Sequence, residues 1–233
     1  MKNLSSYLLF CILIILTTSC ENDDDEVLNE EQEKLIKITE KIFDDNILIS
    51  NTSINYTYGS NNYVTTELSS SGAEKHYYYN DDNQLTNYQT IDNGTLSDYE
   101  FEYNIDGLII NKLDSNDNII YYYQYNSFQQ LINVNDVLSL TYSNDGNIAT
   151  KTDSNGNVDS YEYDNKNNPY KLLFPESVSK INFWNNNNII SENQTDYTIE
   201  YIYNNNDYPT NSILTATTSN GNILKQIREY FYE

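Results

Sequence analysis

Aromatic and aliphatic residues recur along this chain at a fixed distance. In eight places an aromatic residue is followed six positions later by an aliphatic residue or Pro, with mostly polar residues between them. Repetition of this kind indicates one supersecondary unit that the chain uses many times. The pairs are Tyr58/Val64, Tyr79/Leu85, Tyr103/Ile109, Tyr125/Leu131, Tyr142/Ile148, Tyr163/Pro169, Phe183/Ile189 and Tyr203/Pro209.

The constant spacing fits a β-hairpin with a three-residue loop. If the loop is placed at Asn144-Asp145-Gly146, Tyr142 faces Ile148 across the hairpin. The last loop residue then adopts the left-handed backbone conformation, which favours Gly, Asn and Asp. Seven of the eight copies have such a residue, and the fourth does not: Asn62, Asn83, Gly107, Gln129, Gly146, Asn167, Asn187 and Asp207.

The turns at the opposite ends of the hairpins can be located from the spacing between successive copies. If the aliphatic residue of one copy pairs with the aromatic residue of the next, turns fall at Ser71-Gly72, Asn155-Gly156 and Asn220-Gly221. Asn-Gly is a strong signal for a two-residue hairpin turn, so we predict such turns there. Two further midpoints fall at Gly94 and Asp117, in turn-like sequence.

The predicted register places Tyr142, Ile148, Tyr163 and Pro169 in one row across four successive strands. Cross-strand aromatic and β-branched pairs contribute ~0.2–1 kcal/mol each, so a long series of them could stabilise the domain. We expect the least regular sheet around Asp136, where the hairpin is short, and around Glu176, where the connection is longer.

Two interpretations are open for the segment before the first repeat. Leu28, Leu35, Ile38 and Ile42 fit one face of a helix over residues 29–43. Residues 35–49 also fit a strand, a turn at Asp44-Asp45-Asn46 and a second strand, which we prefer.

These patterns predict an all-β domain over residues 34–233, built as an antiparallel β-meander of repeated hairpins. We expect roughly fourteen to sixteen strands, and a twisted sheet of that size must coil strongly, fold into two layers or close like a barrel. The sequence leaves these alternatives open.

The best-defined copy resembles YD repeats, the β-hairpin repeats of Rhs-type proteins. Tyr161-Glu162-Tyr163-Asp164 and Thr152-Asp153-Ser154-Asn155-Gly156-Asn157 carry the resemblance, which covers roughly residues 35–233. The chain is also similar to YD-like lipoproteins of unknown function from Bacteroidota. This resemblance implies a fold far more than a function.

Composition and charge narrow the classes of partner. The 233 residues include 12 basic and 35 acidic ones, for a formal net charge of −23. Nucleic acid is therefore not an expected partner, because its phosphates would be repelled. The 24 Tyr residues argue for a folded, β-rich protein, since disordered chains have few aromatics.

The N-terminus has the features of a lipoprotein signal. Lys2 precedes a ten-residue apolar run, Tyr7–Leu16, which is too short to span a bilayer. Thr17-Thr18-Ser19-Cys20 resembles a bacterial lipobox, with Thr17 in place of the usual Leu. The acidic run after Cys20 looks like the surface-export signal of Bacteroidota lipoproteins, or is a solvated spacer.

We therefore expect a signal peptide over residues 1–19, lipidation of Cys20, and an acidic tether over residues 20–33. The lipid anchor at Cys20 would hold the protein at the outer membrane, exposed on the cell surface. With Cys11 removed and Cys20 lipidated, the mature domain has no free thiol and no disulfide.

Residues for catalysis or metal binding are sparse. The single His, His76, lies on a predicted strand and is best explained as structural, and we expect no cofactor, no metal and no enzymatic activity. Asp153, Asn155, Asn157 and Asp159 alternate as calcium ligands do, but they also suit the hairpin turn better. A glycan-processing hydrolase is the alternative function, with carboxylates paired among Glu100, Glu102, Glu162, Asp164 and Glu200.

Tyrosine clusters are the remaining candidate binding residues. Aromatic rows can stack on sugars or anchor a protein, although the simpler interpretation is that these rings cover a half-buried sheet. We predict a monomeric, non-enzymatic binding or scaffold module for a glycan or an envelope partner. Its candidate binding residues are Tyr77, Tyr79, Tyr99, Tyr103, Tyr121 and Tyr123.

Overall fold

The computed structural model describes residues 33–193, 197–218 and 221–233, which belong to one compact unit, Glu33–Glu233. The predicted signal peptide, Cys20 and the acidic segment up to residue 32 lie outside the described residues. Among the residues described, no helix has the length and apolar character needed to cross a membrane.

The unit is almost entirely antiparallel β-structure, with one short helix, α1 (Glu176–Ile181). The strands are β1 (Leu35–Asp44), β2 (Ile47–Tyr58), β3 (Val64–Ser69), β4 (Glu74–Tyr79), β5 (Leu85–Asp92), β6 (Thr95–Tyr103), β7 (Ile109–Asp114), β8 (Ile119–Tyr125), β9 (Leu131–Val134), β10 (Leu138–Tyr142), β11 (Ile148–Asp153), β12 (Val158–Tyr163), β13 (Ile189–Glu192), β14 (Tyr197–Tyr203), β15 (Pro209–Thr217) and β16 (Ile223–Tyr232).

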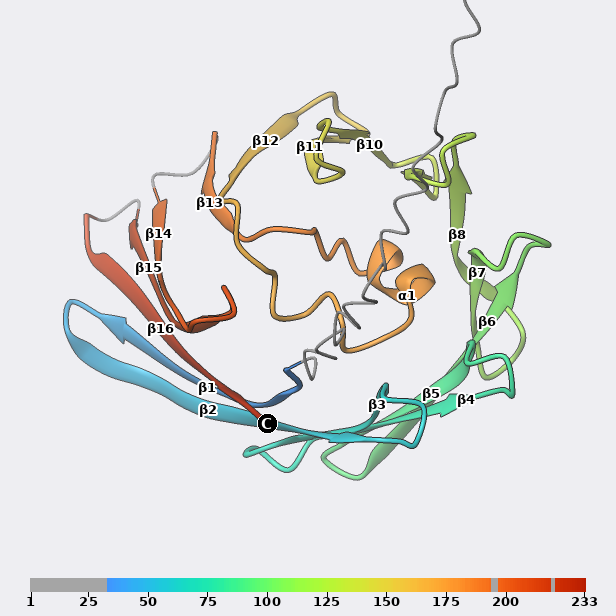
Figure 1. Ribbon diagram of the computed structural model, residues 1–233, viewed down its shortest axis with the longest axis horizontal. Coiled ribbons are helices and arrows are strands. Elements are labelled where there is room, and N and C mark those ends of the chain that lie inside the picture. Colours follow the sequence, from blue (N-terminus) through green and yellow to red (C-terminus); the bar gives the residue numbers. More distant parts are fainter. Residues whose placement is uncertain (1–32, 194–196, 219–220) are drawn as a thin grey trace, which may run out of the picture. The chain divides into compact units, whose positions relative to one another are not determined.

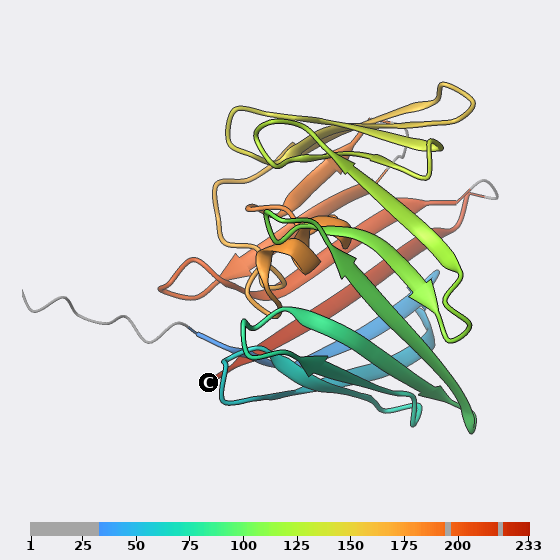
Figure 2. The same cartoon turned by 90° about the vertical axis from the view of Figure 1, so that its right-hand side faces the viewer.

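The strands form one sheet that curls into a nearly closed barrel (Figures 1 and 2). Each strand pairs with the next one in the chain except β13 with β14, and β1 pairs with β16, so β13 and β14 are the two ends of the strand order. The hydroxyl of Tyr201 on β14 donates to the carbonyl of Ile189 on β13 across 3.0 Å. The predicted all-β meander is confirmed, and its curvature is barrel-like.

The β1–β2 hairpin settles the two interpretations of the first segment in favour of strands. Its two-residue turn, Asp45-Asn46, has φ values of 46° and 68°. Such a pair of positive φ values is typical of the tight turn that matches strand twist. The helical interpretation is wrong for the described part of the segment, residues 33–43.

The three-residue loops predicted after the aromatic residues are present in six of the eight copies. In these six copies the aromatic residue pairs with its aliphatic partner, as Tyr142 does with Ile148. Their last loop residues all have positive φ, including Gln129 at 58°, although Gln is not favoured there.

The turns at Gly72, Gly156 and Gly221 lie where the sequence predicts them, but the prediction of two-residue turns is wrong. The N–H of Asp153 bonds to the carbonyl of Asn157, and Gly156 alone in that loop has a positive φ, 83°. This is a three-residue loop rather than a two-residue Asn-Gly turn, and the loops at Gly72 and Gly221 bond in the same way. The register of strands β11 and β12 therefore differs by one residue from the predicted row.

The repeat is broken between β12 and β13. Tyr163 pairs with Ile189, so residues 164–188 leave the sheet and Pro169 and Phe183 are not strand residues, contrary to the prediction. We call residues 164–188 the insertion. It includes α1 and lies inside the curve of the sheet, as Figure 1 shows.

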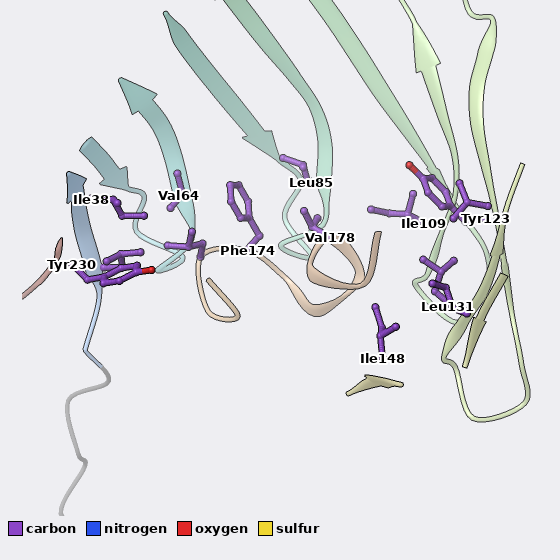
Figure 3. Close-up of a cluster of buried hydrophobic side chains, with 14 residues drawn as sticks. Ile38, Val64, Leu85, Ile109, Tyr123, Leu131, Ile148, Phe174, Val178 and Tyr230 are labelled. Atoms are coloured by element: carbon purple, nitrogen blue, oxygen red, sulfur yellow. The ribbon is translucent and has the colours of Figure 1, made fainter. Parts of the chain in front are cut away.

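The insertion fills one part of the barrel interior. Leu173, Phe174 and Val178 are at most 3% exposed and pack with the aliphatic residues of the wall. Figure 3 shows Phe174 and Val178 within this cluster. The N–H of Val64 donates to the carbonyl of Leu173 across 2.9 Å, which fastens the insertion to β3. Burial of large apolar side chains on both sides makes the insertion part of the hydrophobic core.

Seven tyrosines, six of them repeated aromatic residues, also hold the wall together through their hydroxyl groups. In each of the seven, the hydroxyl donates to the backbone carbonyl of the apolar residue that begins a preceding strand, at 2.6–2.9 Å. We call these residues the tyrosine girdle. Its members and their acceptors are Tyr58 to Leu35, Tyr79 to Val64, Tyr103 to Leu85, Tyr125 to Ile109, Tyr142 to Leu131, Tyr163 to Ile148, and Tyr232 to Pro209.

Candidate functional site

The six tyrosines predicted as binding residues occupy alternate positions on three strands and point to the inner face. The pairs lie on β4 (Tyr77, Tyr79), β6 (Tyr99, Tyr103) and β8 (Tyr121, Tyr123). Residues two apart on a strand share a face, and the buried core lies on this one. The sheet therefore brings the six residues to the same wall of the lumen.

Three of the six are placed as structural residues. Tyr79 and Tyr103 belong to the tyrosine girdle, so their hydroxyls are bonded to the backbone. Tyr123 is 8% exposed and belongs to the buried core. Burial raises the pKa of all three, and for Tyr103 the value is about 12. These rings are packed, and little of their surface is left for a ligand.

The other three contribute to a stack of rings in the lumen. Tyr88 lies between Tyr77 and Tyr99, with centroid distances of 5.7 and 4.9 Å. The Lys112 amine lies 4.2 Å from the centroid of Tyr99 and 5.6 Å from that of Tyr121, and it donates to the Tyr88 hydroxyl at 2.7 Å. Burial, followed by the charge of Lys75, lowers the pKa of Lys112.

Two hydroxyls of this stack, those of Tyr77 and Tyr88, already have hydrogen-bond partners. The hydroxyl of Tyr77 donates to Glu67 at 2.7 Å, and Glu67 pairs with Lys75 at 3.0 Å. Ring faces that pack on each other or on an amine are not free to stack on a sugar. This wall faces the barrel interior, and the hydroxyl of Tyr77 and the amine of Lys112 already have hydrogen-bond partners.

A pocket on another wall has polar groups that are not paired in this way. It lies between β1, β2 and β16 on one side and Tyr170 of the insertion on the other. Its volume is ≈ 130 Å³, and Ile38, Ile54, Tyr56 and Tyr170 supply apolar surface. The side chains of Arg228 and Glu40 in this pocket keep 35% and 24% exposure, so a ligand could reach them.

Arg228 is held by one edge of its guanidinium group. Its Nε donates to Oε2 of Glu40 at 2.7 Å, and Gln226 donates to the same oxygen at 2.8 Å. Within the described residues, the other two nitrogens of Arg228 make no hydrogen bond. Burial by itself lowers the pKa of Arg228, but Tyr170, Tyr230 and Glu40 together raise it above its ordinary value, so the group stays charged.

Tyr170 connects the pocket to the single tryptophan of the chain. Its ring stacks on Trp184 at 6.1 Å and meets Tyr230 edge-on at 6.4 Å. Burial raises the pKa of Tyr170 well above its ordinary value, followed by an effect of Tyr230. A ligand that contacts Tyr170 would therefore change the surroundings of Trp184, because the two rings stack.

The carboxylates considered for hydrolysis lie on three strands and at the start of the insertion. Glu100 and Glu102 are on β6, Glu162 is on β12 and Glu200 is on β14, and these three strands are not neighbours in the sheet. Asp164 accepts hydrogen bonds from Tyr203 and from the N–H of Asn188, where the insertion begins and ends. The sheet does not bring these groups into one cleft.

The remaining candidates for chemistry have structural partners. His76 lies 3.0 Å from Glu74 on the same strand. Asp153 accepts the N–H groups of Asn155 and Asn157 at 2.8 and 2.9 Å, so the proposed calcium loop is a hairpin turn. In the part of the chain that the structure describes, no group of three His, Cys, Asp or Glu side chains could hold a metal ion.

The pocket was missed at the level of sequence, although two signals were available. Arg228 is the only arginine and Trp184 the only tryptophan in a chain rich in acidic residues and Tyr. Arg228 is also two residues from Tyr230 in a segment predicted as strand, which places both side chains on the same face of the sheet. Tyr170 could not be placed from sequence, because the repeat predicts it on a strand.

Comparisons with solved structures give matches at low identity. A porin-like protein from Bacteroides uniformis matches 85% of this chain and 98% of its own, at 13% identity and a TM-score of 0.42. The TcdB2–TccC3 complex matches 77% of this chain at 19% identity and a TM-score of 0.32, and the Photorhabdus luminescens Tc holotoxin pore matches 77% at 17% identity and 0.31.

The chain spans 10% of the length of these toxin chains. No family model and no curated protein matches the sequence. The resemblance to YD repeats therefore stays a prediction.

Proposed function

We propose that this protein is a non-enzymatic binding lipoprotein, held at the outer membrane by lipid on Cys20 and exposed at the cell surface. The observation that supports binding is the pocket inside the barrel, where one edge of Arg228 beside Tyr170 makes no hydrogen bond to the described part of the chain. Buried or half-buried polar groups are normally paired, so a group that stays open in a concave site favours a ligand. A glycan is the proposed class of ligand.

The proposed location at the outer membrane rests on the sequence of the N-terminus. Labelled palmitate should be incorporated into the full chain in a Gram-negative host and not into Cys20→Ala. Protease added to intact cells should degrade the wild-type protein if it faces outward. Equal labelling of both proteins would refute the lipid anchor, and protection from protease would refute surface exposure.

Binding and hydrolysis can be separated with the same ligands. We expect purified mature protein to bind members of a glycan array and to release no sugar from them during prolonged incubation. Released sugar would instead support the hydrolase. An array without any bound glycan would contradict the proposed ligand class.

A further inference from the structure

The pocket beside Tyr170 presents a hydrogen-bond donor and an acceptor next to each other. Nε of Arg228 is bonded to Glu40, and the other two guanidinium nitrogens make no hydrogen bond to any residue that the structure describes. Oε2 of Glu40 accepts two hydrogen bonds, whereas its Oε1 accepts none from the described residues. A ligand in this pocket can therefore accept from Arg228 and donate to Glu40 at neighbouring atoms.

The charges favour a neutral ligand. Arg228 and Glu40 already neutralise each other at 2.7 Å, so the pair has little net charge with which to attract an ion. The chain as a whole carries a formal charge of −23, which repels anions. A hydroxyl group is both donor and acceptor, and two adjacent hydroxyls match the pair without bringing a charge out of water.

The size and the walls of the pocket agree with such a ligand. A cavity of ≈ 130 Å³ has room for a group much larger than one water molecule. Ile38, Ile54 and the rings of Tyr56 and Tyr170 offer apolar surface, on which the C–H face of a sugar ring can pack. Polyhydroxylated rings combine such faces with adjacent hydroxyls.

We propose that this pocket binds one neutral sugar ring, with adjacent hydroxyls on Arg228 and Glu40 and its C–H face against Tyr170. The proposal rests on the proposed function, because it names the site and the chemistry of the glycan. Residues of three wall strands and the insertion are all needed, so only the folded barrel forms the site.

Fluorescence of Trp184 provides the measurement, because it is the only tryptophan and stacks on Tyr170. The mature protein is titrated with neutral methyl glycosides of glucose, galactose and mannose, with glucuronate, and with alanine as a zwitterion. We expect saturable binding of at least one methyl glycoside. Arg228→Lys and Glu40→Gln should each weaken it by about tenfold to a hundredfold, since hydrogen bonds to charged groups are lost.

Lys225→Gln is the matched control, because Lys225 lies on β16 at a position that alternates with the inward-facing ones. It should leave binding unchanged, and thermal unfolding of each variant shows whether it is folded. If one pocket variant does not fold, the other still tests the site.

Two results would overturn the proposal. The first is glycan binding that Arg228→Lys and Glu40→Gln leave unchanged, which places the ligand elsewhere but keeps the proposed function. The second is a preference for glucuronate or alanine over the neutral glycosides. An array without bound glycan would instead contradict the proposed function itself.

Discussion

The repeated wall of the barrel and the insertion at residues 164–188 differ in how their side chains are paired. In the wall, the hydroxyls of the tyrosine girdle bond to backbone carbonyls, and Lys112 is enclosed by Tyr88, Tyr99 and Tyr121. Where the insertion meets β1, β2 and β16, one edge of Arg228 has no hydrogen-bond partner among the described residues. We therefore propose a division of roles, in which the repeat supplies stability and the interruption of the repeat supplies the binding site.

The largest expected effect is alkaline unfolding of the whole unit, which tests whether wall and insertion form one cooperative structure. Burial raises the pKa of Tyr103 and Tyr142 to about 12 and raises that of Tyr58, Tyr79 and Tyr125 further. In the unfolded chain the pKa is about 10. Stability should thus be complete below about pH 10 and fall as pH rises through the range up to about 12 and beyond.

Two probes separate the regions in this titration. Phenolate absorbance is dominated by the many Tyr residues of the wall, whereas Trp184 fluorescence reports the insertion. We expect both signals to change at the same pH, because the insertion shares its core with the wall. A fluorescence change at clearly lower pH would show that the insertion separates from the core before the wall unfolds.

The second prediction concerns the apolar contact between the two regions. Phe174 is 3% exposed and meets Tyr77 of the wall edge-on at 4.6 Å. Phe174→Ala should reduce the free energy of unfolding by about 3–5 kcal/mol, as measured by urea unfolding, because a large buried ring is lost. Phe128→Ala is the control, since Phe128 is 82% exposed, and should change stability by less than about 0.5 kcal/mol. Similar effects of both changes would mean that the insertion is not packed as described.

The sequence predicted the wall well because its rules are local. The six-residue spacing follows from hairpin geometry, and even Gln129 adopts the left-handed conformation, since its neighbours fix the loop. The class of the Gly156 turn was wrong because two- and three-residue loops differ by one residue of register. Loops of both lengths accept the same Asn-Gly sequence.

The insertion and the pocket could not be predicted in this way. Pro169 and Phe183 match the six-residue spacing, yet residues near them bond to distant parts of the chain. Asn185, for example, accepts a hydrogen bond from the N–H of Ile148 through its side chain. The contact of Tyr170 with β1, β2 and β16 depends on closure of the sheet. Short spacing rules do not contain that information.

The third prediction isolates one hydrogen bond of the tyrosine girdle. The Tyr125 hydroxyl donates to the carbonyl of Ile109 at 2.8 Å, and Tyr125→Phe leaves that buried carbonyl without this donor. We expect a loss of about 1 kcal/mol in the free energy of unfolding. Tyr78→Phe is the comparison, because the Tyr78 hydroxyl bonds to Gln89 in an exposed position. Equal effects would show that the girdle adds no more than an ordinary surface contact.

The smallest expected effect is that of calcium on the wall, which should be none. Both oxygens of Asp153 already accept hydrogen bonds, Oδ1 from the N–H groups of Asn155 and Asn157, and Oδ2 from the Asn157 side chain at 2.8 Å. The hydrogens of these donors point to the oxygens where a cation would have to bind, and these bonds, that of the Asn157 side chain first, lower the pKa of Asp153.

Calcium would therefore have to break the turn before it could bind. Millimolar calcium should leave the melting temperature unchanged, with magnesium at equal ionic strength as the control. A rise specific to calcium, lost in Asp153→Asn, would show that a turn of the repeat holds a ligand. In that case the division of roles between wall and insertion would not stand, because the repeat itself would carry a binding site.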